Sequence, residues 1–159
     1  MSFEEAVLLE VVRAVDRVKL DAILIGNGAA ALHGVPITTQ DIDLFVRDTP
    51  RNADKIDQLV AALGKNVVAS RPFEPSSRMI RIEGLPVDVD LVFELSSHAK
   101  FESVRARSEV LTIEGVSFRV ANLQDVIDAK RAANRLKDQA VLPLLEQFQR
   151  VRDALKESP

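Results

Sequence analysis

One stretch decides the fold class of this chain: Thr39-Gln40-Asp41-Ile42-Asp43-Leu44-Phe45-Val46. Side chains alternate between the two faces of a strand, so Asp41 and Asp43 are expected to point the same way. Their Cα atoms would lie roughly 7 Å apart, close enough for both carboxylates to reach divalent ions. The pair therefore predicts a strand at 42–46 that carries a cation site. Solvated acids on an exposed strand edge would produce the same pattern.

Helical and extended segments alternate on both sides of this strand. Apolar residues recur at helical spacing from Val7 to Val18, which predicts a helix at 3–19. Further strands are predicted at 22–25, 66–70, 78–82, 87–93, 110–113 and 116–120, and further helices at 29–33, 52–63, 100–107, 122–134 and 138–155. The two prolines and paired serines of 71–77 predict an exposed loop. Because helices and strands interleave without a strict βαβ rhythm, we expect an α/β (α+β) fold, with helices packed on a mixed sheet.

Composition limits the class of protein. A chain of 159 residues with 47% hydrophobic content and no flexible linker is expected to form a single domain, with a core at 20–121 and C-terminal helices at 122–156. The absence of cysteine excludes disulfides and thiolate metal sites. Apolar runs fall short of the roughly 18 residues of a membrane span and no signal-peptide pattern is present, so we expect a cytoplasmic protein. The formal charge of −3 argues against sequence-independent coating of DNA.

A glycine-containing turn, Gly26-Asn27-Gly28, follows the strand predicted at 22–25. Strand, turn and helix in succession leave the first backbone N–H groups of the helix free to face an anion, and the two glycines remove side chains that would block its approach. An ordinary tight turn has the same pattern. The turn therefore predicts a phosphate site only when it is combined with the acidic residues.

A second strand with alternating acids, Val87-Asp88-Val89-Asp90-Leu91-Val92-Phe93, strengthens the metal interpretation. Three or four carboxylates on adjacent strands of an apolar sheet repel one another unless cations neutralise them. Their oxygens suit Mg²⁺ or Mn²⁺, and the phosphates of a nucleoside triphosphate would complete the coordination. We expect Asp90 to be the third carboxylate of a two-metal site and to assist deprotonation of an attacking hydroxyl. Asp88, on the same face, is the alternative.

The order of these motifs resembles the signature of the polymerase-β-like nucleotidyltransferase superfamily. The resemblance runs through Gly26-Asn27-Gly28, His33-Gly34-Val35-Pro36 and Thr39-Gln40-Asp41-Ile42-Asp43, and it is closest to small bacterial members related to abortive-infection and toxin–antitoxin nucleotidyltransferases. It covers 22–148. The later residues that carry it are Val89-Asp90-Leu91, Asp125, Lys130, Arg135 and Asp138.

The resemblance implies transfer of a nucleoside monophosphate from an NTP to an acceptor hydroxyl, with pyrophosphate as the leaving group. Asp41 and Asp43 would bind both metal ions, and Asp90 would assist deprotonation of the acceptor. The residues that would hold the nucleotide are Gly26, Asn27, Gly28, Thr39 and Lys130. The acceptor could be a protein, a tRNA end or a small molecule, and the toxin–antitoxin relatives imply an antitoxin partner.

Two positions depart from the superfamily pattern. Asn27 stands where Gly or Ser is usual, and Ile37 stands where Arg often precedes the Thr. These departures leave a second hypothesis open: a catalytically inactive nucleotide-binding or interaction protein of the same fold, such as one half of a toxin–antitoxin pair. A third hypothesis is a structural cation site without a nucleotide.

The basic residues of the predicted C-terminal helices have two possible roles. Lys130 could contact phosphates, or it could belong to a solvated helix face; the residues of that face would be Lys130, Arg131, Arg135 and Lys137, interrupted by Asp125, Asp128 and Asp138. The solvated face is the expected structure. His33 is expected to be a helix-end residue that bonds nearby backbone rather than a base.

Overall fold

The computed structural model describes residues 3–70 and 78–158, and the side chain of residue 3 is not part of the description. The strands are β1 (Ala22–Ile25), β2 (Asp41–Val46), β3 (Val68–Ser70), β4 (Met79–Glu83), β5 (Asp88–Val92), β6 (Glu109–Ile113) and β7 (Val116–Val120). The helices are α1 (Phe3–Val18), α2 (Gly26–Leu32), α3 (Pro50–Leu63), α4 (Phe101–Arg107), α5 (Leu123–Ala133) and α6 (Leu136–Glu157). The loop predicted at 71–77 lies outside the described residues.

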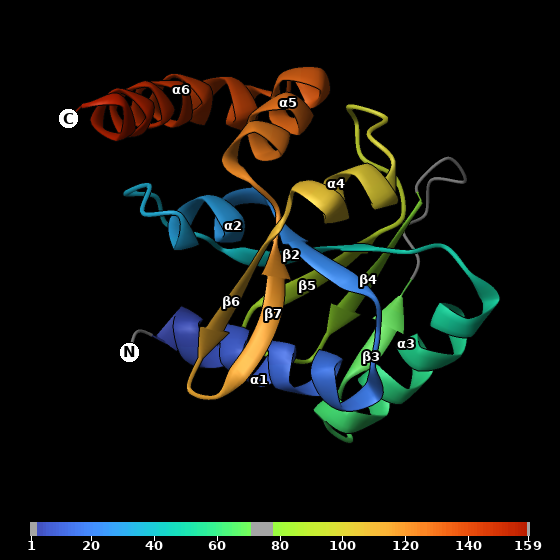
Figure 1. Cartoon of the computed structure of the whole chain (residues 1–159). Coiled ribbons are helices and arrows are strands. Elements are labelled where there is room, and N and C mark those ends of the chain that lie inside the picture. The colour runs from blue at the N-terminus through green and yellow to red at the C-terminus, as the bar shows by residue number, and fades with distance from the viewer. Residues whose placement is uncertain (1–2, 71–77, 159) are drawn as a thin grey trace.

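A mixed seven-stranded sheet forms the centre of the molecule, with the strand order β3-β4-β5-β2-β1-β7-β6. Strand β2 runs parallel to β5 and antiparallel to β1, and β1 runs parallel to β7. Helices α1 and α3 lie along one side of the sheet, whereas α2, α4 and the α5–α6 pair lie on the other (Figure 1). The predicted α/β (α+β) class with a mixed sheet and a C-terminal helical pair is confirmed.

The apolar stripe of α1 packs against the sheet, as its helical spacing predicts. Val11 is fully buried in this helix, and the strand residues Ile23 and Val89 are fully buried in the sheet. Side chains such as these contribute on the order of 2 kcal/mol each when removed from water. In the described ranges, no helix combines the length and apolar character needed to cross a membrane.

The register between β2 and β5 brings the two acidic strands together. Asp41 lies opposite Asp88, and Asp43 lies opposite Asp90, with the strands parallel. Parallel neighbours keep equivalent side chains on the same face, so the acids of both strands line one side of the sheet. This side faces α5 and carries the candidate site.

The helix after β1 begins at Gly26, not after Gly28 as predicted. Gly26 has a φ of +68°, which turns the chain out of β1 within a single residue. Asn27 and Gly28 therefore form the first turn of α2 rather than a separate loop.

Candidate functional site

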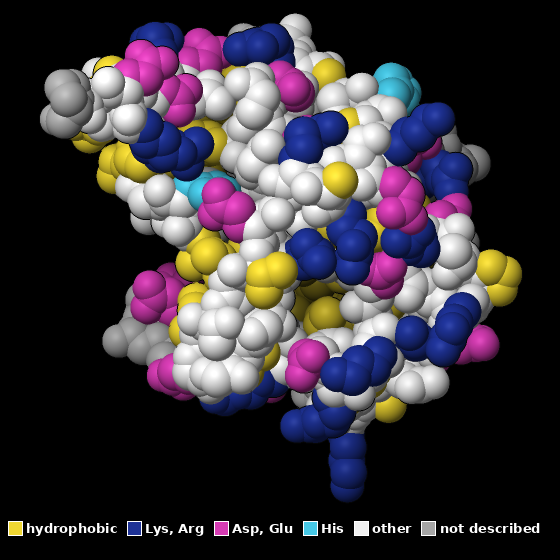
Figure 2. All heavy atoms as spheres, viewed as in Figure 1, with side chains coloured by type: hydrophobic (Ala, Val, Ile, Leu, Met, Phe, Trp, Pro, Cys, Tyr) yellow, Lys and Arg dark blue, Asp and Glu magenta, His cyan; other side chains and the backbone are white. Residues whose placement is uncertain are grey.

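A pocket of about 460 Å³ lies over the sheet face that carries Asp41 and Asp43. Its walls come from the β1–α2 junction, from β2, β4 and β5, from α4 and from the α5–α6 pair. The basic residues in these walls are Arg78, Arg81, Lys130, Arg135 and Lys137. On the molecular face shown in Figure 2, Lys and Arg side chains are interspersed with Asp and Glu side chains, and several basic side chains gather toward the lower edge of the view.

Asp41, Asp43 and Asp90 meet in this pocket. One carboxylate oxygen of each lies within 4.8 Å of the others. The cluster contains Asp90 rather than Asp88, whose side chain is exposed at the start of β5. Three hard oxygen donors at this spacing fit a divalent cation such as Mg²⁺ or Mn²⁺.

The electrostatics of Asp43 reflect this crowding of carboxylates. Burial, followed by the charges of Asp41 and Asp90, raises the pKa of Asp43 from 3.8 to about 7, while Lys130 and Lys137 oppose the shift. Each neighbouring negative charge disfavours ionisation of Asp43. A bound cation would relieve this repulsion and favour the ionised form of Asp43.

Arg81 already provides one positive charge to the cluster. Its Nε and Nη2 donate to the two oxygens of Asp90, at 2.8 and 3.2 Å. This bond is the main cause that raises the pKa of Arg81 above its ordinary value. Asp90 is 5% exposed, so Arg81 compensates a buried carboxylate.

Gly26 lies against Asp43. A Cβ placed on Gly26 would lie 2.7 Å from Oδ2 of Asp43, a distance that no side chain could tolerate without a shift. By contrast, the nearest atoms to a Cβ on Gly28 belong to Leu24, away from the pocket. Of the three predicted turn residues, Gly26 lies in the pocket wall, and Asn27 and Gly28 do not.

Lys130 reaches the same pocket from α5. Its side chain is 12% exposed, and Nζ lies 3.8 Å from Oδ1 of Asp138. Burial lowers the pKa of Lys130, while the charges of Asp138 and Asp43 oppose that shift. The expected solvated face is therefore wrong for Lys130, because α6 covers it. The expectation of a solvated face holds for Arg131, whose side chain is 57% exposed and pairs with Glu146.

Solved structures with a similar fold include nucleotidyltransferases. No family model and no curated protein matches the sequence. TM1012 of Thermotoga maritima, a protein assigned to the nucleotidyltransferases, superposes with a TM-score of 0.61 at 18% identity, over 99% of this chain and 97% of that one. ANT(2″)-Ia in complex with adenylyl-2″-tobramycin gives a TM-score of 0.63 at 16% identity, over 98% of each chain. The solution structure of the antibiotic-resistance factor ANT(2″)-Ia gives 0.55 at 17% identity, over 98% of this chain and 97% of that one.

The chain shares the fold of these nucleotidyltransferase structures. Within this fold, the structure places Thr39 beside the acids rather than in the pocket wall. The Thr39 hydroxyl donates to the backbone carbonyl of Asp41 at 2.6 Å, so it fixes the chain just before β2.

His33 lies at the end of α2, as predicted, but its ring bonds backbone that is distant in sequence rather than nearby. It caps the C-terminus of α2, and its Nε2 lies 2.7 Å from the carbonyl oxygen of Ala121. The bond joins α2 to the segment that leads into α5. The bonded backbone is distant in sequence, which the helix-end pattern alone does not indicate.

Arg81 and Arg107 pair with carboxylates of the pocket wall but were not predicted from the sequence. Arg107, at the end of α4, donates to both oxygens of Asp125 at 2.9 and 2.8 Å and ties α4 to α5. No local pattern pairs these residues. Arg81 had a detectable signal, because the predicted β4–β5 hairpin brings it across from Asp90.

Proposed function

We propose that the protein is a metal-dependent nucleotidyltransferase that transfers a nucleoside monophosphate from an NTP to an acceptor hydroxyl and releases pyrophosphate. The convergence of Asp41, Asp43 and Asp90 in one pocket of a nucleotidyltransferase fold carries this proposal. Lys130 and Gly26 lie in the same wall, where they could contact the phosphates. We also propose one domain and a cytoplasmic location.

Metal ions are an integral part of the proposal. Asp41 and Asp43 would hold them, with Asp90 as the third ligand and Asp88 as the alternative. Bound Mg²⁺ or Mn²⁺ would balance charge on the attacking and leaving oxygens. The raised pKa of Asp43 supports this assignment, because unpaired carboxylates in that position repel one another.

The chain's own residues would orient the reactants and move one proton. The acceptor oxygen forms a bond to the α-phosphorus, and the bond from that phosphorus to the pyrophosphate oxygen breaks. The acceptor proton passes to a carboxylate oxygen of Asp90. Arg81 fixes that carboxylate through two contacts, and Lys130 brings positive charge toward the phosphates.

The N-terminal turn of α2 would approach the phosphates through its backbone. Gly26 would supply its N–H group from the pocket wall, and Asn27 and Gly28 are assigned N–H contacts from the sequence resemblance alone. Thr39 would support the site by fixing the backbone of Asp41. Among the described atoms, Asn27 Oδ1 is buried and has no hydrogen-bond partner.

The acceptor is a separate part of the proposal. ANT(2″)-Ia was solved with adenylyl-2″-tobramycin, a nucleotidylated small molecule, which supports a small-molecule acceptor for this fold. Protein side chains and tRNA ends are the other acceptors that we propose to test. An antitoxin partner is proposed from the sequence resemblance alone.

Arg81 favours a second candidate function. Because it engages both oxygens of Asp90, the carboxylate that would accept the proton is already paired. A nucleotide-binding protein without turnover, such as a toxin–antitoxin component, would retain the fold and the cation site under this arrangement.

The test is incubation with each labelled NTP, Mg²⁺ and cell extract, followed by detection of label on protein, RNA and small molecules. Transfer by the wild type that is abolished in Asp41→Asn/Asp43→Asn supports the enzyme. Asp54→Asn, an exposed acid on α3, serves as the matched control. Mg²⁺-dependent NTP binding without any transfer supports the inactive protein, and metal binding that NTP does not enhance supports a structural cation site.

A further inference from the structure

We infer that Asp138, on α6, is a positioning residue that holds Lys130 and Arg135 in the pocket wall for contact with the nucleotide phosphates. The inference rests on the proposed function, since it assigns a role within the same nucleotide site. It concerns a carboxylate outside the acidic cluster that does not itself line the pocket.

The contacts of Asp138 converge from two elements. The side chain is 1% exposed, and its oxygens accept bonds from Arg135 Nε at 2.7 Å and Nη2 at 3.2 Å. Lys130 Nζ, on α5, lies 3.8 Å from Oδ1. A single buried carboxylate thus meets two cations, and both cations belong to the pocket wall.

Helix capping accounts for only part of this arrangement. Asp138 also accepts the backbone N–H of Arg135 at 3.1 Å, and this bond caps the N-terminus of α6. An exposed carboxylate would cap the helix equally well. The burial of Asp138 beside Lys130 is not required for capping, whereas it is required to place the Lys130 ammonium.

Lys130 lies within the field of two acidic sites. The charges of both Asp138 and Asp43 act on it, with Asp138 the stronger. Asp138 therefore keeps Lys130 from pairing fully with Asp43, which belongs to the proposed cation site. Without Asp138, we expect Lys130 to be drawn toward Asp43 and away from its position in the pocket wall.

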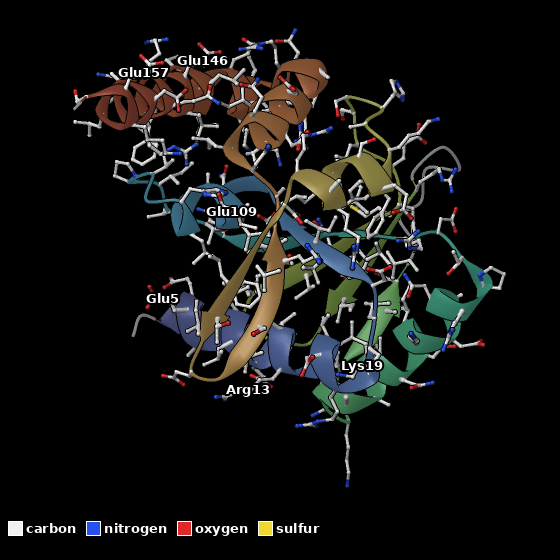
Figure 3. All side chains as sticks on the ribbon, viewed as in Figure 1. Glu5, Arg13, Lys19, Glu109, Glu146 and Glu157 are labelled. Carbon is white, nitrogen blue, oxygen red and sulfur yellow. The ribbon has the colours of Figure 1, made fainter. Side chains whose placement is uncertain are left out.

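The experiment measures equilibrium binding of labelled NTP in Mg²⁺, which requires no acceptor. Asp138→Asn keeps the size of the side chain and an oxygen that can cap α6, but it removes the charge. We expect the Kd for NTP to rise about tenfold. Glu146→Gln is the matched control, because it breaks the 2.8 Å Arg131–Glu146 pair between the same two helices, on a part of α6 away from the sheet (Figure 3).

A double-mutant cycle separates positioning from a general loss of structure. If Asp138 acts partly through Lys130, Asp138→Asn combined with Lys130→Met should weaken binding by less than the product of the two single effects. Asp138→Glu, which retains the charge and the cap, should restore part of the affinity and provides a second variant if Asp138→Asn folds poorly. Far-UV circular dichroism checks folding of each variant.

The outcomes distinguish the inference from the proposed function. Wild-type protein that binds no NTP in Mg²⁺ would refute both. Wild-type binding with an unchanged Kd in Asp138→Asn, or with single effects that multiply in the double variant, would refute the inference alone. An equal loss of affinity in Glu146→Gln would also refute it, because helix docking would then explain the effect.

Discussion

Replacing Asp43 with Asn should stabilise the metal-free protein above about pH 7, although it removes a charged group from the proposed site. Burial and two neighbouring carboxylates raise the pKa of Asp43 from 3.8 to about 7. Between these values the folded protein binds a proton that the unfolded chain has lost. Stability from this group is therefore complete below pH 3.8 and is lost as the pH rises to about 7.

The magnitude follows from the size of the shift. One pKa unit corresponds to about 1.4 kcal/mol, so the free energy of unfolding should fall by at most about 4 kcal/mol across this range. The amide side chain of the Asp43→Asn variant does not titrate, so the variant should lack this pH-dependent fall in the free energy of unfolding. Saturating Mg²⁺ should raise the stability of the wild type above pH 7, since the cation offsets the repulsion, and should have a smaller effect on the variant.

Urea unfolding of both proteins in a metal chelator measures the difference. The chain contains neither Trp nor Tyr, so far-UV circular dichroism is the appropriate signal. Other titrating groups cancel when the two proteins are compared at each pH. A stability difference that stays constant from pH 3.8 to pH 7 would refute the reasoning, because the pKa of Asp43 would then be unshifted in the folded protein.

Three further substitutions test the site and its surroundings. Gly26→Ala should cost about 1–2 kcal/mol in urea unfolding and weaken Mg²⁺ binding, because φ is +68° and a Cβ would lie 2.7 Å from Asp43 Oδ2; unchanged Mg²⁺ affinity would contradict the close approach. Arg81→Met should destabilise the metal-free protein by about 1–3 kcal/mol, since it leaves the buried carboxylate of Asp90 unpaired, yet should tighten Mg²⁺ binding in calorimetry by removing a competing cation. Asn122→Ala should cost about 1 kcal/mol through loss of the α5 cap, with no change in Mg²⁺ affinity.

The elements that sequence predicted well are those whose pairing is local. The β4–β5 and β6–β7 hairpins each turn at a glycine, and Gly84 and Gly115 have φ of +103° and +80°. Alternation and turn residues are sufficient to predict such hairpins. The parallel register of β2 with β5 joins distant segments, and no local signal specifies which acid lies opposite which. The start of α2 was mispredicted because a single glycine makes the whole turn.

The sequence pattern predicts the environment of the acidic residues in this site better than that of the basic residues. A lysine beside an arginine on a helix has the same pattern whether the face is solvated or covered, and for Lys130 the outcome depends on α6 and Asp138. Alternating acids between apolar residues are costly in a sheet unless something neutralises them, so few structures accommodate them. In this fold Arg81 pairs with Asp90, yet the charges of Asp41 and Asp90 still raise the pKa of Asp43. It is this remaining repulsion, rather than the number of acids, that argues for a cation.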